Sequence, residues 1–376
     1  MPTSKKRPRA RDLGLIIGEL SPGNNNHLSD VSDVRVGHST IIKGDGKLIP
    51  GKGPVRTGVT VILPHANNIF HEKVPAAAYV ANGFGKATGI PQIEDLGVIE
   101  TPIAITNTLN VGLVWDAVMD WMLQENPEIG VSTGSVSPVI AECFDGYLND
   151  IRGRHVKAER VFQAISGARE QTNLTEGVVG AGTGMCVFQL KSGVGSASRV
   201  IPKQKGGFTV GVLTVPNFGR LKDLTILGVP IGKQLSKKKT LTQESHSPEG
   251  GSIVTVIATD APLTSRQLFR VAKRAMVGIA RTGSIIGHSS GDFVFTFSTN
   301  PTINHDPKEL SVKERLAGEG FLLNDLFRAT IEATEEAIIN ALFQARTIIG
   351  RDNNTAYALP VEETVAILKE RDLIAD

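Results

Sequence analysis

The pattern of apolar and polar positions predicts strands and helices that alternate along the chain. Short runs of β-branched and apolar residues, bounded by polar or glycine-containing turns, are typical of buried strands. Such runs predict strands at 30–38, 58–64, 103–106, 135–142, 185–190, 195–201, 208–215, 252–259 and 293–298. Apolar residues at helical spacing predict helices at 112–124, 157–167, 264–281, 308–317, 322–348 and 360–371. Strands flanked by helices throughout predict a layered α/β fold.

One junction in this pattern, Gly251–Ser252, is a candidate for catalytic chemistry. The polar segment 232–251 has no periodicity and is predicted to be an exposed linker, and a strand is predicted to begin at Ser252. If the Gly251–Ser252 bond were cut, Ser252 would become an N-terminus whose α-amine is a base for its own hydroxyl. The same residues also suit an ordinary loop that enters a strand, so the stretch alone leaves both interpretations open.

Composition narrows the possible functions. The chain has 376 residues, 40% hydrophobic and 21% charged, which is typical of a globular protein with one large domain or two. A net charge of +2 gives no basic field for nucleic acid. Two cysteines, Cys143 and Cys186, predict neither a disulfide framework nor a zinc site. Because no apolar run approaches the ~18 residues of a membrane span, we expect a cytoplasmic protein without a membrane partner.

The sequence does not support three common kinds of site: a dinucleotide site, a metal site and a Ser-His-Asp triad. The glycine run at 180–185 ends in Met185 where a dinucleotide motif needs its third glycine. No two histidines have metal-ligand spacing, and His65 and His71 come nearest, so neither a metal nor a cofactor is predicted. The pattern G-x-S-x-G occurs at 130–134 and 287–291, but each leads into a predicted strand and not into a helix, so no nucleophile elbow is predicted. His288 lies beside two serines on a turn, where neighbouring side chains seldom face each other.

The amine-as-base scheme at Ser252 needs further groups. Donors must stabilise the oxyanion on the attacked carbonyl, and Tyr147 and Asn217, each in a polar turn after an apolar strand, are of the right type. Ser290 and Asp292 offer a hydroxyl and a carboxylate that would orient the amine. Taken singly, Tyr147 is typical of a half-buried packing residue and Asn217 of a turn former, and spacing alone does not bring the four to Ser252.

Long motifs follow one another in order over nearly the whole chain. They are RARDLG at 9–14, SDVRVGH at 32–38, TGVTVILPH at 57–65, EKVPAA at 72–77, NGFGKATG at 82–89, ETPIAITNTLNVG at 100–112, ECFDGYLND at 142–150, VVGAGTGM at 178–185, GGSIVTVIATDAPL at 250–263, GHSSGD at 287–292, EATEEAIINAL at 332–342 and NNTAYALP at 353–360. With them the chain resembles the L-aminopeptidase/D-amino-acid esterase–amidase and β-aminopeptidase family of self-processing hydrolases.

The resemblance implies a fold and an assembly. The fold would be a four-layer α/β/β/α sandwich that resembles the N-terminal-nucleophile hydrolases but has a different strand connectivity. The chain would be one domain, 1–376, cut between Gly251 and Ser252 into an α-chain, 1–251, and a β-chain, 252–376. The assembly would be a homotetramer of these α/β heterodimers.

The resemblance also implies roles for the candidate residues. Ser252 would be the nucleophile and its α-amine the base. Tyr147 and Asn217 would help to hold the oxyanion, while Ser290 and Asp292 would hydrogen-bond the amine or the nucleophile. The role of Asp292 is the least fixed of these, because family members differ in the acid at that position.

The implied activity is that of an aminopeptidase without cofactor. It would release L-, D- or β-amino acids from short peptides, amides or esters, and Glu142 or Asp145 would bind the substrate's ammonium group. Two alternatives remain open at this point: a related self-cleaving acyltransferase, and an uncleaved scaffold protein without activity. The presence of Ser252, Ser290 and Asp292 counts against the scaffold.

Overall fold

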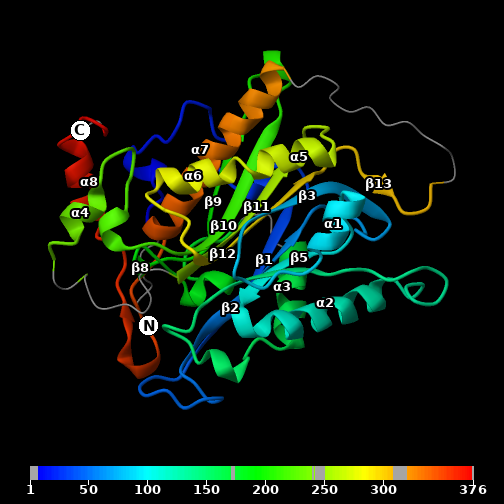
Figure 1. Cartoon of the computed structure of the whole chain (residues 1–376), viewed down its shortest axis with the longest axis horizontal. Coiled ribbons are helices and arrows are strands. Elements are labelled where there is room, and N and C mark those ends of the chain that lie inside the picture. The colour runs from blue at the N-terminus through cyan, green and yellow to red at the C-terminus, as the bar shows by residue number, and fades with distance from the viewer. Residues whose placement is uncertain (1–6, 171–173, 239–240, 242–249, 308–319, 375–376) are drawn as a thin grey trace.

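The computed structural model describes residues 7–170, 174–238, 241, 250–307 and 320–374. Two β-sheets lie face to face, and helices cover the outer face of each sheet (Figure 1). The predicted α/β layering is therefore present, in the order α/β/β/α.

The first sheet has four strands in the order β1-β2-β5-β6. The strands are β1 (Arg35–Lys43), β2 (Val55–Leu63), β5 (Ile103–Asn107) and β6 (Val139–Cys143). Only the β5–β6 pair among them is parallel. Helices α2 (Val111–Glu125) and α3 (Ala158–Glu170) cover its outer face. Gly37 of β1 allows α3 to pack this closely, because a Cβ there would lie 1.9 Å from the Ala164 carbonyl oxygen.

The second sheet has seven strands and contains the Gly251–Ser252 junction. Its order is β13-β3-β12-β11-β10-β9, with β4 also paired with β3. The strands are β3 (Glu72–Gly83), β4 (Val98–Ile99), β9 (Gly195–Val200), β10 (Thr209–Asn217), β11 (Gly250–Thr259), β12 (Ser289–Ser298) and β13 (Ile303–Asn304). The pair β11–β12 is parallel, and its neighbours β10 and β3 run antiparallel to it.

Three helices cover the second sheet. They are α5 (Ser265–Ala272), α6 (Ala275–Arg281) and α7 (Phe321–Phe343). Helix α7 packs on β9 and β10, α5 packs on β3 and β12, and α6 packs against α7. Figure 1 shows these three helices on the side of the molecule opposite to α2 and α3.

Shorter elements complete the described chain. The helices are α1 (Ile90–Leu96), α4 (Ile231–Leu235) and α8 (Val361–Lys369), and the hairpins are β7 (Cys186–Val187) with β8 (Leu190–Lys191) and β14 (Ile348–Ile349) with β15 (Thr355–Ala356). Short 3-10 helices lie at Arg11–Leu13, Leu28–Asp30, Thr108–Asn110, Ile151–Gly153, Gly180–Gly184, Lys203–Lys205, Leu221–Asp223 and Arg351–Asn353. Within the described ranges, no helix combines the length and the apolar character needed to cross a membrane.

The main core lies between the two sheets. Phe293, Phe295 and Phe297 of β12 point into it, as their alternation predicted. Val294, on the opposite face of β12, packs in a second cluster under the covering helices. Strands buried on both faces are largely apolar, which explains why β11 is apolar from Ile253 to Ala258 except at Thr255.

Several predicted elements differ from the structure. Strand β3 was not predicted, because its sequence EKVPAAAYVANG is rich in alanine and contains proline and glycine. Helix α1 was also not predicted. The single helix predicted at 264–281 is two helices, because the chain turns at Lys273 and Arg274 so that α6 can pack against α7. The helix predicted at 308–317 lies outside the described residues.

The junction itself also differs from the prediction. Strand β11 begins at Gly250, not at Ser252, because Gly250 and Gly251 pair with Ser289 and Ser290 of β12. The Gly251–Ser252 bond therefore lies within the strand. Part of the predicted linker, Ile231–Leu235, is the helix α4, and residues 242–249 lie outside the described residues.

Candidate active site

Ser252 lies at the centre of the second sheet, near the start of β11. Its neighbours in register are Asn217, the last residue of β10, and Gly291 of β12. Gly251 is paired in the same way with Ser290. The sheet thus brings Ser252, Asn217 and Ser290 together from segments far apart in sequence, and the side chain of Ser252 is only 3% exposed.

The first sheet approaches Ser252 through the turn that follows β6. The backbone N–H of Phe144 donates a hydrogen bond to Ser252 Oγ at 3.3 Å. The thiol of the preceding residue, Cys143, donates to the carbonyl of Val215 at 3.1 Å. Burial raises the pKa of the Cys143 thiol far above its usual range, so this thiol stays protonated and does not compete with Ser252 as a nucleophile.

Asn217 is held in a fixed orientation beside the same turn. Its Oδ1 accepts a hydrogen bond from the Cys186 N–H at 2.8 Å, and its Nδ2 donates to the Phe144 carbonyl at 2.8 Å. An amide donor and a backbone N–H therefore lie on the Phe144 side of Ser252. This is the kind of donor pair that stabilises an oxyanion, and the contribution of Phe144 was not predicted because a backbone donor has no mark in the sequence.

Ser290 and Asp292 form the hydroxyl–carboxylate pair that their spacing suggested. Ser290 Oγ donates to Asp292 Oδ1 at 2.6 Å, and both residues are buried. Asn82, at the end of β3, donates from Nδ2 to Asp292 Oδ2 at 3.3 Å and to the Gly287 carbonyl at 2.8 Å. Burial raises the pKa of Asp292, and the hydrogen bonds from Ser290 and Asn82 act in the opposite direction. Asn82 was missed because its strand was missed.

Tyr147 lies in the turn after β6, half-buried. Burial raises the pKa of its phenol, and the next contributions come from Cys186 and Tyr357. Its backbone carbonyl accepts a hydrogen bond from Asn354 Nδ2 at 2.8 Å. Tyr147 is thus a neighbour of Cys186, the residue whose N–H orients Asn217.

The two carboxylates considered for substrate binding have different surroundings. Glu142 is the last residue but one of β6 and accepts hydrogen bonds from the Lys86 N–H at 3.1 Å and from the Thr108 hydroxyl. Asp145 is 1% exposed and accepts from Asn149 Nδ2 at 3.0 Å. Burial raises the pKa of Glu142, and it raises the pKa of Asp145 to about 7.

A cavity of about 300 Å³ opens on the Gly251 side of the junction. Its lining includes Gly251, Ser290, Arg220, Asp223 and His288. Arg220 Nε donates to Asp223 Oδ2 at 2.8 Å, so Asp223 partly neutralises the positive charge of the Arg220 guanidinium group. In the described ranges, no group of three or more His, Cys, Asp or Glu side chains is suited to hold a metal ion.

Known proteins match this chain over most of its length. The protein-family model described as "Peptidase family S58" matches residues 26–356. The chain belongs to peptidase family S58. The beta-peptidyl aminopeptidase BapA of Sphingosinicella xenopeptidilytica is 40% identical to this S58 member, over 97% of the chain and 92% of its own length.

Solved structures of other proteins share the fold of this S58 chain. The PH0078 protein of Pyrococcus horikoshii OT3 is 52% identical, with a TM-score of 0.91 over 97% of this chain and 99% of its own. The L-aminopeptidase D-Ala-esterase/amidase of Ochrobactrum anthropi is 35% identical, with a TM-score of 0.88 over 98% of this chain and 100% of its own. The latter structure is described as a prototype for the serine aminopeptidases and a new variant of the Ntn hydrolase fold.

The comparisons confirm the family and the fold class expected from the motifs. This S58 chain is a peptidase, and therefore a hydrolase, with a mixed α/β fold of the N-terminal-nucleophile type.

Proposed function

We propose that the chain is a serine aminopeptidase that cuts its own Gly251–Ser252 bond and then uses Ser252 as nucleophile. The observation that carries the proposal is the setting of Ser252 Oγ, which accepts a hydrogen bond from Phe144 of one sheet while Asn217 and Ser290 flank its strand in the other. The S58 relatives described as aminopeptidases support the same activity.

The first reaction would be self-cleavage. Ser252 Oγ attacks the carbonyl carbon of Gly251, the C–N bond breaks, and the Gly251 acyl group moves to the oxygen while Ser252 gains a free α-amine. Water then hydrolyses this ester to give the fragments 1–251 and 252–376. Glycine suits position 251 because a Cβ there would lie 2.8 Å from the Phe218 Cβ.

The second reaction would be turnover of a substrate. The α-amine of Ser252 has an ordinary pKa of about 7.7–8.0, so it accepts the hydroxyl proton near neutral pH. Oγ attacks the first carbonyl of the substrate, the amine returns the proton to the leaving group, and water hydrolyses the acyl-enzyme. We assign stabilisation of the oxyanion to the Phe144 N–H and the Asn217 amide, with Tyr147 as the third candidate donor.

Ser290 and Asp292 would orient the new amine. Because Gly251 is paired with Ser290, the amine released at Ser252 would emerge beside the Ser290 hydroxyl. That hydroxyl donates its proton to Asp292, so its lone pairs can accept an N–H of the amine. This leaves the nitrogen lone pair free to face Ser252 Oγ.

The substrate would lie across Ser252 with its two halves on opposite sides. We keep Glu142 and Asp145 as candidates for the ammonium group, and favour Glu142 because Asp145 is enclosed by Asn149 and its neighbours. The leaving group would occupy the cavity beside Gly251. Short peptides, amides or esters with a free L-, D- or β-amino end are the proposed substrates.

We further propose that the enzyme works in the cytoplasm as a homotetramer of two-fragment units, without nucleic-acid or membrane partners. Both of its cysteines are free thiols, as suits a reducing compartment, and the small net charge of +2 gives no field for nucleic acid. The tetramer rests on the family resemblance.

A denaturing gel tests the central claim. The wild-type protein should give two bands, residues 1–251 and 252–376, about 2:1 in mass, and the smaller should begin at Ser252. Ser252→Ala should give one full-length band, while Ser132→Ala, at an exposed turn, should be cut normally. A single band from the wild type would contradict self-cleavage.

A substrate panel tests the turnover. L-, D- and β-aminoacyl p-nitroanilides should release p-nitroaniline with the cut enzyme but not with Ser252→Ala. With an added amine, free amino acid should remain the main product. Transfer of the acyl group to the amine as the main product would identify an acyltransferase instead, and no release from any compound would contradict the aminopeptidase.

A further inference from the structure

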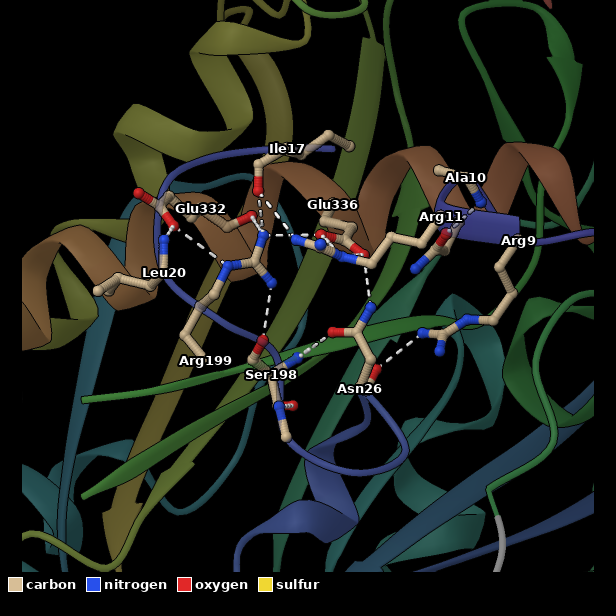
Figure 2. Close-up of polar contacts among 12 residues, drawn as sticks. Arg9, Ala10, Arg11, Ile17, Leu20, Asn26, Ser198, Arg199, Glu332 and Glu336 are labelled. Carbon is tan, nitrogen blue, oxygen red and sulfur yellow. Dashed lines mark hydrogen bonds and ion pairs between the residues drawn. The ribbon is translucent and has the colours of Figure 1, made fainter. Parts of the chain in front are cut away.

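A buried group of four charged side chains connects the two parts of the chain that the proposed cut would separate (Figure 2). We call it the clasp: Arg11, Arg199, Glu332 and Glu336. Arg199 lies on β9, Arg11 lies near the N-terminus, and the two glutamates lie one helical turn apart on α7. Residues at this spacing share one face of a helix.

The clasp is paired internally. Arg199 Nε lies 3.1 Å from Glu332 Oε2, and Arg199 Nη2 lies 2.7 Å from Glu336 Oε2. Arg11 Nε lies 2.8 Å from Glu336 Oε1. The side chains of Arg199 and Glu336 are 0% exposed. Arg199 and Glu336 thus pair away from water, where removal of one partner leaves a buried charge with less compensation, while Arg11 remains partly exposed.

The segment around Arg11 is fastened to α7 by additional hydrogen bonds. Together with the clasp they hold residues 9–26 across the helix, as Figure 2 shows. These hydrogen bonds are Ala10 N to Asn340 Oδ1 at 3.1 Å, Leu20 N to Glu332 Oε2 at 3.0 Å and Asn26 Nδ2 to Glu336 Oε1 at 2.5 Å.

The cut at Gly251–Ser252 would divide the clasp by sign of charge. Both arginines would belong to the fragment 1–251 and both glutamates to the fragment 252–376. We propose that the clasp, together with the strand pairs β10–β11 and β3–β12, fastens the first fragment to the second after the cut. This inference rests on the proposed self-cleavage. The two clasp arginines of the first fragment fit an acidic helix face with carboxylates four residues apart, which α7 of the second fragment supplies.

The clasp also bears on the active site, which takes its residues from both fragments. Phe144 and Asn217 would come from the first fragment, and Ser252 and Ser290 from the second. Helix α7 packs on β9 and β10, and β10 ends at Asn217. By fastening β9 to α7, the clasp holds the oxyanion donors of one fragment against the nucleophile of the other.

The test uses the cut enzyme in a series of urea concentrations, with the two fragments separated by size-exclusion chromatography. Glu336→Gln should release the fragments at lower urea than the wild type, with an apparent dissociation constant at least about tenfold higher, because Arg11 loses its charge partner and the buried Arg199 keeps only Glu332. Glu335→Gln is the matched control. Glu335 is adjacent on α7, but its ion pair is with Arg281 of the same fragment, at 3.4 Å, and Arg199 acts on it less strongly than Arg281 does.

A second variant keeps the test decisive if Glu336→Gln does not fold. Arg11→Gln removes a guanidinium group whose side chain is 22% exposed, so we expect a smaller shift in the same direction. In the uncut Ser252→Ala background, Glu336→Gln should lower the urea midpoint by an amount independent of protein concentration, because a tethered pair cannot separate.

The possible failures are distinguishable. Two bands on a denaturing gel, together with release curves of Glu336→Gln and Arg11→Gln equal to that of Glu335→Gln, would overturn the clasp alone. In that case the strand pairing of β10 with β11 and of β3 with β12 would hold the fragments. One full-length wild-type band would overturn the self-cleavage on which the inference rests.

Discussion

Asp145 lies next to the residue that contacts Ser252, yet its carboxyl group belongs to a buried polar network. Its Oδ2 and the Oδ1 of Asn107 are both buried without a hydrogen-bond partner. Burial raises the pKa of Asp145 to about 7, although hydrogen bonds from Thr57, Asn149 and Asn107 act in the opposite direction. Burial therefore favours the protonated form of this carboxyl group.

The raised pKa of Asp145 predicts a pH-dependent stability. Between an unfolded pKa of 3.8 and a folded pKa of about 7, the folded state binds more protons than the unfolded state, so stability falls as the pH rises through this window. Asp145→Asn keeps the shape and cannot ionise. Relative to the wild type, the variant should gain up to about 4 kcal/mol between pH 4 and pH 8, at 1.36 kcal/mol per pKa unit.

Urea unfolding at several pH values, in the uncut Ser252→Ala background, measures this difference. Asp116→Asn makes the same chemical change at an exposed position of α2 and should show a nearly flat difference. An equally flat profile for Asp145→Asn would mean that Asp145 is ionised in the folded protein.

At the scale of elements, the hairpin β7–β8 is anchored by a buried lysine. Lys191 is fully buried and its Nζ donates to the carbonyls of Gly182 at 3.1 Å, Met185 at 2.8 Å and Ser192. Burial lowers the pKa of this ammonium group to about 8. Cys186, opposite Lys191 in the hairpin, supplies the N–H that orients Asn217. The lysine therefore acts on the site through the backbone of the hairpin.

Lys191→Met should damage both stability and turnover. It leaves carbonyl groups buried without their donor, which we expect to cost about 1–3 kcal/mol in the free energy of unfolding. Because Asn217 loses its fixed orientation, kcat should fall roughly 10- to 100-fold, less than the 10²–10³ that loss of an oxyanion donor costs, while KM changes little. Lys205→Met, at an exposed ion pair with Asp325, should do neither. An unchanged kcat in Lys191→Met would refute the positioning role.

The elements also show what local sequence can predict. Strands such as β2 and β10 are visible as β-branched runs, and their bounds were predicted within a few residues. Strand β3 was not recognisable in the sequence, because alanine has a low strand propensity. Ala76 and Ala78 are small residues that lie opposite Phe297 and Phe295 of β12. The need for small side chains at these positions comes from the neighbouring strand and not from the propensity of β3 itself.

The same reasoning applies to the site. Ser290 and Asp292 were found because two side chains of the right type lie two residues apart, and the structure joins them by a hydrogen bond. The Phe144 donor is a backbone N–H, which every residue type except proline would supply. Asn82 depends on the register of β3, so neither could be predicted before the sheets were known.

At the scale of the whole molecule, the assembly can be measured directly. We expect light scattering to give about 160 kDa, four times the 40.1 kDa of one chain. The uncut Ser252→Ala variant should have the same mass, because the cut removes no residues. A mass near that of one chain, at the concentrations used for activity, would refute the tetramer.

The strand order of the second sheet has a consequence for how such a molecule is made. β12 and all of β11 from Ser252 onward follow the proposed cut, but they lie between β10 and β3, which precede it. Alone, the second fragment would present a parallel strand pair with both edges bare, and bare edges invite aggregation. If the chain is cut as proposed, the peptide bond at Gly251–Ser252 would serve only during folding. It would keep the interleaved strands at high local concentration until they have paired.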